Sequence, residues 1–134
     1  MATKVTIQVE KGKQDKNFSC FMVEKFPDFS LAGFGNSAKQ AIEDMYVAQQ
    51  EIKELLEEEG KQMPELEFTF RFDIGSFFDY YPYLNMSGVA KKAGINASLM
   101  RQYAMGMHEP SQKRKLQILD CLHQISQEMQ TVVI

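Results

Sequence analysis

The chain has 134 residues, of which 44% are hydrophobic and 25% charged, so it is long enough for one compact domain or two very small ones. Its net charge of −3 excludes a protein that coats nucleic acid through a surface that is basic all over. No stretch approaches the roughly 20 consecutive apolar residues that a membrane-spanning helix needs, and the N-terminus does not read as a signal sequence. We therefore expect a cytoplasmic protein with no membrane partner.

The two cysteines, Cys20 and Cys121, lie far apart in the chain and form no CxxC motif. We expect neither a disulfide framework nor a zinc site, and both side chains are predicted to be small buried hydrophobes. No metal and no cofactor is expected.

The charge is divided unevenly along the chain. Residues 1–75 hold nine Lys and Arg against fourteen Asp and Glu, a balance of −5, while residues 76–134 hold six against four, a balance of +2. This asymmetry indicates that the two parts meet different partners.

The N-terminal part begins with patterns typical of a small sheet. Apolar and polar residues alternate over 5–10, which predicts a strand with one wet face. A polar hairpin loop over 11–17 and a second strand over 18–23 are expected next. A Phe-Pro-Asp turn then precedes a third strand over 29–34.

A long helix is predicted to follow. It begins at Ser37 in a capping box, in which the Gln40 side chain reaches back to the Ser37 amide and the Ser37 hydroxyl accepts from the Gln40 amide. It ends at Gly60, shortly before Pro64. Spacings of three, four and seven place on its inner face Ala38, Ala41, Ile42, Met45, Ile52, Leu55 and Leu56.

A fourth strand is predicted over 66–72, where aromatic and polar residues alternate, so the order is β-β-β-α-β. If the third and fourth strands are parallel, a right-handed crossover joins them. The acidic residues of the helix are predicted to form a solvated face, which can attract a basic protein partner. These residues are Glu43, Asp44, Glu51, Glu54, Glu57, Glu58 and Glu59.

The C-terminal part opens with an aromatic segment over 77–84, which predicts one short helix distorted at Pro82. The next helix is predicted to be capped by Asn85 or Ser87 and to turn at Gly94. Its inward side chains are Val89, Ala90 and Ala93, and its outward side chains are Lys91 and Lys92.

A further helix is predicted to start at Asn96 or Ser98 and to end at Gly106, with Leu99, Met100 and Tyr103 facing inward. An irregular loop with Pro110 leads to a last helix capped by Ser111. The predicted inner side of that helix consists of Leu116, Leu119, Leu122, Ile125 and Met129.

The spacing within residues 89–106 matches a helix-turn-helix. This motif needs a small residue where the helices cross, a glycine at the turn, and apolar positions about six and nine residues beyond it. Ala90, Gly94, Met100 and Tyr103 meet these conditions. A helical hairpin without a ligand is the alternative, but the loop after Gly106 resembles that of Xre/Cro-type repressor domains, and the positive charge favours DNA.

Residues 26–65, FPDFSLAGFGNSAKQAIEDMYVAQQEIKELLEEEGKQMPE, carry a second resemblance. They have a Phe-Pro-Asp turn, a short strand, a glycine with a small polar residue, and a long helix ending near Gly-x-x-x-Pro. The matching positions are Phe26, Pro27, Asp28, Gly35, Ser37, Ala41, Gly60 and Pro64. This pattern resembles the HicB family of bacterial antitoxins.

Together the two resemblances imply an α+β protein in two domains. Residues 1–74 are expected to form a partial ribonuclease H-like β-β-β-α-β domain, and residues 75–134 an all-α helix-turn-helix domain. The implied function is that of an antitoxin in a type II toxin–antitoxin system. It neutralises a small HicA-like mRNA-cleaving toxin and, as an autorepressor, binds its own double-stranded operator DNA. The toxin-contact residues are not assigned.

The expected DNA interface centres on the second helix of the hairpin. Base edges in the major groove would meet Asn96, Ala97, Ser98, Arg101 and Gln102, with Arg101 suited to guanine and Gln102 to adenine. The candidate phosphate contacts are Lys91, Lys92, Lys113 and Arg114. Because six positive residues give one copy little affinity, a homodimer or higher homo-oligomer that reads two half-sites is expected.

Two other functions fit the same sequence. One is a solitary regulator whose sheet domain serves dimerisation or senses a ligand. The other is a metal-dependent nuclease, with Glu10, Asp28, Glu43 and Asp44 as the available acids. No strand places an isolated acid at a core position, so we expect a protein that is not an enzyme.

Overall fold

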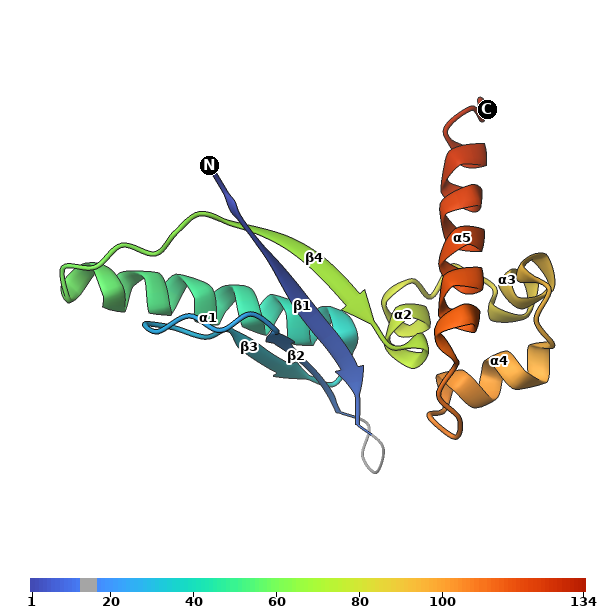
Figure 1. Ribbon diagram of the computed structural model, residues 1–134, viewed down its shortest axis with the longest axis horizontal. Helices are drawn as coiled ribbons and strands as arrows, with labels where there is room; N and C mark the ends of the chain where they lie inside the picture. Colours follow the sequence, from blue (N-terminus) through green and yellow to red (C-terminus); the bar gives the residue numbers. More distant parts are fainter. Residues whose placement is uncertain (13–16) are drawn as a thin grey trace. The chain divides into compact units, whose positions relative to one another are not determined.

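The computed structural model describes residues 1–12 and 17–134, so the expected hairpin loop over 11–17 lies largely outside the described residues. Over these residues the protein is mixed α+β, with four strands in one mixed sheet and five helices (Figure 1). The chain divides into two compact units, Met1–Tyr80 and Tyr81–Ile134. None of the helices in the described chain combines the length and the apolar character needed to span a bilayer.

The first unit is built on the sheet, whose strands are β1 (Thr3–Lys11), β2 (Phe18–Met22), β3 (Ala32–Gly35) and β4 (Leu66–Phe72). Their spatial order is β3-β2-β1-β4. β1 pairs antiparallel with β2 and parallel with β4, and β2 pairs antiparallel with β3. The chain therefore passes from one edge of the sheet to the other between β3 and β4, and the handedness of that connection stays a prediction.

The third strand is shorter than the predicted 29–34. Phe26 and Phe29 stack on each other with ring centroids 5.0 Å apart, which holds this stretch in a turn before Ala32. Only Leu31 still reaches the sheet, where its carbonyl accepts from the Met22 amide at 3.0 Å. The strand prediction was wrong here because an aromatic pair closes the turn.

Helix α1 (Ala38–Glu58) begins as predicted, with the Ser37 hydroxyl accepting from the Gln40 amide at 3.1 Å. The return bond differs, because the Gln40 side chain reaches one residue further back and accepts from the Asn36 amide at 3.0 Å. The helix ends before Gly60, as predicted.

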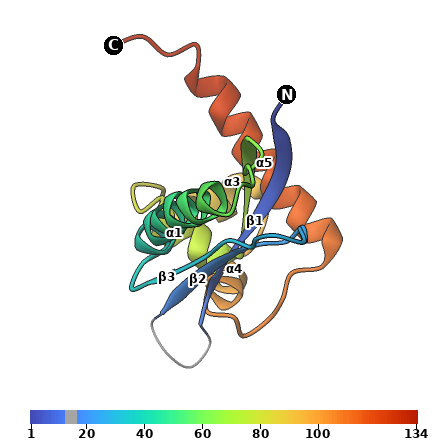
Figure 2. The ribbon, with the colours of Figure 1, turned by 90° about the vertical axis from the view of Figure 1, so that its left-hand side faces the viewer.

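Helix α1 covers one face of the sheet, mainly over β3 and β2 (Figure 2). Its approach to β3 is close, because a methyl group at Gly33 would fall on the Ala41 carbonyl and lie 2.6 Å from the Met45 amide nitrogen. Leu56 is buried and Leu55 is 52% exposed, which corrects the predicted inner face: consecutive side chains on a helix diverge by about 100°. The core contains Val5, Ile7, Val9, Phe18, Cys20, Met22, Leu31, Ala38, Ala41, Ile42 and Met45.

Helix α2 (Ile74–Tyr80) replaces the helix predicted around Pro82. The Asp73 carboxylate accepts from the Ser76 amide at 2.8 Å and starts the helix early. Proline disfavours helical backbone in the residue before it, which is consistent with the helix ending before Tyr81. The rings of Phe77 and Tyr80 contact that of Phe72, so this helix belongs to the first unit, and the units divide after Tyr80 rather than after residue 74.

The second unit consists of α3 (Met86–Ala93), α4 (Ala97–Ala104) and α5 (Gln112–Met129). Asn85, Asn96 and Ser111 cap these helices, each accepting a bond from a backbone amide of the first turn. The three predicted starts are confirmed, and the two alternatives that the sequence left open resolve to the asparagines.

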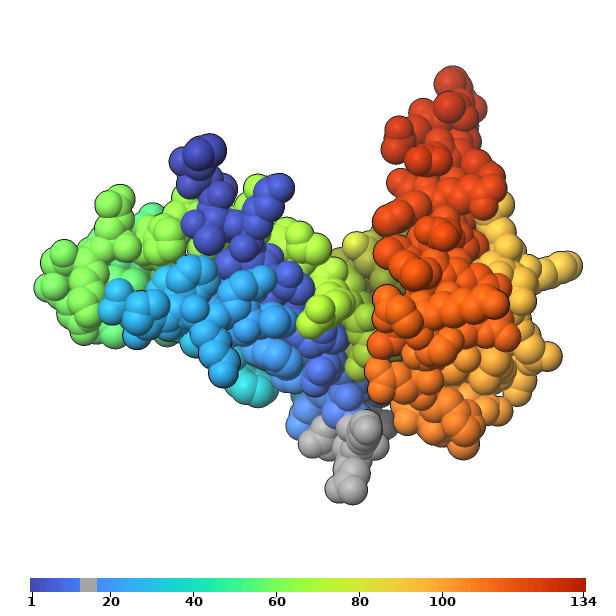
Figure 3. Space-filling model, viewed as in Figure 1, coloured from blue at the N-terminus to red at the C-terminus, as the bar shows by residue number. Residues whose placement is uncertain are grey.

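The inner face of α5 differs from the prediction. Ile118 and Cys121 are buried, whereas Leu116, Leu119 and Met129 are 50%, 45% and 64% exposed. In this orientation Gln117 of α5 also donates to the Ala93 carbonyl at the end of α3. The red C-terminal end of α5 projects from the surface of the second unit (Figure 3), although Glu128 near this end still pairs with Lys92 of α3 at 3.3 Å.

Candidate nucleic-acid interface

The turn between α3 and α4 is held by local backbone geometry. Gly94 has φ +77°, a left-handed conformation that side chains with a Cβ rarely adopt. The Ile95 amide donates to the Ala90 carbonyl at 2.8 Å and the Gly94 amide to the Lys91 carbonyl at 3.2 Å. These two bonds close the end of α3 in the pattern typical of a Schellman motif.

Asn96, two residues after Gly94, caps the start of helix α4 and fixes its direction. The Asn96 side-chain oxygen accepts from the Ser98 amide at 2.8 Å and from the Leu99 amide at 3.4 Å. Asn96 is exposed, but its oxygen is used in this cap. A helix of eight residues is thus fixed at its first turn without help from a long hydrophobic contact.

The inward side chains of the hairpin form a small core with α5. Ala90 and Met100 are fully buried, and Val89 and Ile95 are nearly so. Cys121 of α5 lies against α3, with its Sγ 3.8 Å from the Val89 carbonyl oxygen. The predicted small residue at the crossing, Ala90, and the predicted apolar residue Met100 are therefore confirmed as core residues.

The outward face of α4 carries a stripe of exposed side chains spaced three and four residues apart, Ser98, Arg101 and Met105. Ala97 and Gln102 flank this stripe and are half-buried. The structure thus brings four of the five predicted base-reading side chains onto one side of one helix, and the fifth, Asn96, caps it. Such a surface has the width and polarity of a helix that enters a groove.

Arg101 leans toward the start of α3, where its Nη1 donates to the Ser87 hydroxyl at 3.4 Å. Ser87 is exposed and was considered only as a helix cap in the sequence. Because Asn85 takes the cap, the Ser87 hydroxyl is left on the surface beside Arg101. Sequence reasoning missed Ser87 as a member of this surface. The available signal was that Asn85 and Ser87 both lie at the start of α3, and only one of them can cap the helix.

The four predicted phosphate contacts fall into two groups. Lys91 and Lys113 are exposed, and no ion pair involves either of them in the part of the chain that the structure describes. Lys92 pairs with Glu128 at 3.3 Å, and Arg114 is half-buried with its Nη1 donating to the Gln117 side chain at 3.3 Å. Lys91 and Lys113 are thus the better placed of the four to meet a phosphate.

Gln117 positions α5 against the hairpin. Its Nε2 donates to the Ala93 carbonyl at 2.6 Å, which satisfies an otherwise unpaired acceptor at the end of α3. The bond from Arg114 holds the same carboxamide in place. These two hydrogen bonds are consistent with the orientation in which Ile118 and Cys121 of α5 face inward.

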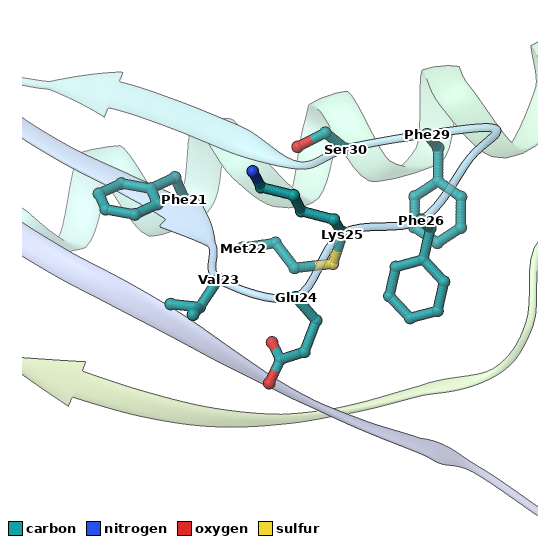
Figure 4. Close-up of a pocket in the computed structure, with 8 residues that line it drawn as sticks. All are labelled: Phe21, Met22, Val23, Glu24, Lys25, Phe26, Phe29 and Ser30. Carbon is teal, nitrogen blue, oxygen red and sulfur yellow. The ribbon is translucent and has the colours of Figure 1, made fainter.

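The first unit offers an acidic surface and an apolar hollow. The acidic residues of α1 named above are exposed, as predicted. The hollow has a volume of about 470 Å³, and Phe26 and Phe29 lie side by side at one end of it (Figure 4). The Glu24 carboxylate accepts from the Thr6 amide at 2.7 Å, which lowers its pKa. The hollow is lined by Phe21, Met22, Val23, Glu24, Lys25, Phe26, Phe29 and Ser30.

Two of the four carboxylates weighed for a nuclease, Asp28 and Asp44, make other contacts. Asp28 pairs with Lys61 at 3.1 Å, and Asp44 accepts from the Phe34 amide at 2.9 Å. Across residues 1–12 and 17–134, His, Cys, Asp and Glu side chains form no group of three suited to a metal ion. The nuclease alternative gains no support from this arrangement.

No protein-family model, no curated protein and no solved structure matches this chain. The resemblances to the HicB family and to Xre/Cro-type repressor domains therefore stay predictions. What is known of the site is its residues and their geometry.

Proposed function

We propose that the second unit is a helix-turn-helix that binds double-stranded operator DNA by placing α4 in the major groove. The observation that carries this proposal is the exposed stripe of Ser98, Arg101 and Met105, flanked by Gln102, on a short helix that Gly94 and Asn96 hold in a fixed direction. Polar side chains are expected on the outer face of any surface helix, so the proposal depends on the residue types: arginine and glutamine can each form two hydrogen bonds to one base edge.

Each outward side chain has a defined partner in this proposal. Arg101 forms a bidentate pair with guanine and Gln102 with adenine, each contact giving ~1–3 kcal/mol of discrimination against the wrong base. Lys91 and Lys113 contact phosphates, which fixes the register of α4 on the duplex. With so few cations one copy binds weakly at cellular salt, so two copies read two half-sites.

For the whole chain we propose the role of an antitoxin. The first unit, a partial ribonuclease H-like domain in this proposal, binds a small basic HicA-like toxin, and the second unit represses the operon. Support comes from the exposed carboxylates of α1, which complement a protein surface built to bind RNA phosphates. The alternative is a solitary regulator whose first unit serves dimerisation or senses a ligand, for which the apolar hollow formed by the end of β2 and the segment 23–30 offers space.

A gel-shift assay with the DNA upstream of the gene tests the DNA proposal. We expect the double variant Arg101→Ala/Gln102→Ala to lose specific affinity by a factor on the order of 100, since two bidentate contacts disappear. The matched control is Lys53→Ala/Gln50→Ala, which removes one cation and one amide from the exposed face of α1. Equal affinity of both variants, with unchanged circular dichroism spectra, would reject α4 as the reading helix.

Co-purification tests the antitoxin role. A tagged chain expressed with the neighbouring reading frame should retain a small basic protein, and Glu51→Lys/Glu54→Lys should release it because two attractive charges become repulsive. If no neighbour binds while operator binding persists, the solitary regulator is the correct function.

A further inference from the structure

The sheet of the first unit ends at β4, which pairs with β1 only. The Asp73 amide donates to the Val9 carbonyl, so the backbone groups of the odd-numbered residues here point toward β1. Backbone groups alternate along a strand, and those of Phe68 and Phe70 therefore point away from the sheet. Edge groups of this kind are a template for another strand.

The opposite edge of the sheet is different. β3 has four residues, and its Phe34 amide, which points outward, donates to the Asp44 carboxylate of α1 at 2.9 Å. A short strand with a capped amide is a poor template for pairing. The seven residues of β4 are thus the more open edge.

The sequence of β4, LEFTFRF, is complementary to itself when it is read in the opposite direction. About Thr69 as the centre, Glu67 and Arg71 occupy equivalent positions, as do Phe68 and Phe70. Glu67, Thr69 and Arg71 are exposed, and the two phenylalanines are half-buried. An antiparallel copy would therefore place opposite charges across from each other and aromatic rings across from each other.

We propose that β4 pairs antiparallel with β4 of a second copy of this chain, on a two-fold axis at Thr69, so that one sheet runs through both copies. Phe68 and the partner's Phe70 then form a hydrogen-bonded pair, which is what their outward backbone groups require. Glu67 and the partner's Arg71 form a non-hydrogen-bonded pair, in which side chains approach most closely.

Neighbouring registers fit less well. Shifting the axis to residue 70 places Glu67 opposite Asp73, two like charges. Shifting it to residue 68 places Pro64 opposite Phe72, and proline has no amide to donate. The axis at Thr69 pairs all seven residues of β4 with β4 of the partner and makes both charged pairs within the strand attractive, whereas an axis at residue 68 or 70 pairs only five of the seven. Just beyond the strand ends, the axis at Thr69 places Glu65 opposite the partner's Asp73.

The aromatic face of β4 supports the same partner. Helix α1 packs mainly over β3 and β2, and its Tyr46 contacts Phe68 edge to face at a ring-centroid distance of 5.7 Å. Even with this contact, Phe68 and Phe70 are only half-buried in one copy. A second copy would bring its Phe70 against Phe68 and its Phe68 against Phe70, which buries rings that one copy leaves half-exposed. This interface goes beyond the proposed function and needs no DNA, so its test is independent of the operator assay.

Oxidative cross-linking of the full chain tests the register. In the proposed pair the Thr69 Cα atoms of the two copies lie about 4.5 Å apart, within disulfide range, so Thr69→Cys should cross-link into a dimer. Glu67→Cys is the matched control on the same edge, because its two copies lie about 14 Å apart. Cys20 and Cys121 are buried and do not compete. No cross-link for Thr69→Cys, or equal cross-linking for both variants, overturns the proposal.

Charge reversal tests the complementarity. Sedimentation equilibrium should show that Glu67→Arg raises the dimer dissociation constant on the order of tenfold, since two attractive pairs become repulsive. The double variant Glu67→Arg/Arg71→Glu exchanges the charges and should restore dimerisation. Glu10→Arg, an equal charge change on β1, should have little effect. A dimer that responds equally to Glu10→Arg, or a double variant that stays monomeric, contradicts the interface.

Discussion

Cys20 shows how a single side chain is fixed by the packing of α1. Its side chain is 1% exposed, and its Sγ donates to the Ala41 carbonyl at 3.3 Å. Burial raises the pKa of this thiol from 9.0 to about 11, against the lowering effect of a bond from the Gly33 backbone and with a further increase from the Asp44 charge. The thiol therefore stays protonated across the physiological range and is a poor nucleophile.

This pKa gives the stability of the first unit a predictable pH dependence. Between pH 9 and about 11 the unfolded chain loses the Cys20 proton while the folded chain keeps it, so the free energy of unfolding falls as pH rises and is unaffected by this group below pH 9. Urea unfolding at pH 8.5 and 10.5 should show a larger loss for the natural chain than for Cys20→Ala. Parallel losses in the two proteins would show that the thiol does not contribute.

Gln117 and Arg114 show the limit of sequence reasoning for single residues. Of the five apolar residues predicted on the inner face of α5, Leu122 and Ile125 are half-buried, whereas Leu116, Leu119 and Met129 are exposed. Apolar periodicity also cannot register that Gln117 binds the open carbonyl of Ala93. The same limit applied to the phosphate contacts, since Arg114 looked free in the sequence and is held by Gln117. Exposure of Ser98 and Arg101 was predictable because it follows from helical spacing alone.

At the scale of secondary-structure elements, β3 and α1 pack closely against each other at Gly33. A methyl group there would meet backbone atoms of Ala41 and Met45, which cannot rotate away as a side chain can. Glycine is thus required at position 33 because α1 lies too close for a Cβ, and at position 94 because the backbone has a positive φ. Each requirement fixes how two elements lie against each other within one unit.

We predict that Gly33→Ala destabilises the first unit by about 1–3 kcal/mol or more, because overpacking against backbone forces α1 away from the sheet. The matched control is Gly88→Ala in α3, where the nearest atom would be Asn85 Cβ at 3.6 Å. That change should be neutral or stabilising by up to about 1 kcal/mol, since alanine favours helix. Thermal unfolding followed by circular dichroism measures both, and similar effects at the two sites would refute the steric explanation.

The ends of an element could be predicted where a side chain close in the sequence caps them, and could not where contacts between rings determine them. Ser37, Asn85, Asn96 and Ser111 start their helices through bonds to amides two or three residues away, so each start could be predicted from the sequence. The start of β3 depends on the ring contact between Phe26 and Phe29, which spacing does not reveal. Helix α2 starts through a local bond to Asp73, but its packing on Phe72, which places it in the first unit, could not be predicted from spacing.

For the whole molecule, the division after Tyr80 has an energetic basis in α2. Asp79 accepts from the Ala38 amide at 2.9 Å at the start of α1, and Phe78 is 8% exposed. The domain boundary expected at residue 74 would separate these groups from the sheet that they complete.

Two fragments test this boundary. The fragment 1–80 should melt at a temperature near that of the first unit in the full chain. The fragment 1–74 lacks the buried Phe78, which is worth about 2 kcal/mol, and should melt at least about 8 °C lower. Equal melting temperatures would show that α2 is dispensable for the first unit.

The bond from the Phe34 amide to Asp44 also bears on how many copies can assemble. A sheet that is open at both edges can add partners without end, and such growth gives fibres. With β3 short and its amide occupied, only β4 is left to pair, and pairing about a two-fold axis uses that edge in both copies at once. In the proposed dimer, Asp44 would therefore prevent further growth at the Phe34 amide, and pairing through β4 would close the assembly at two copies.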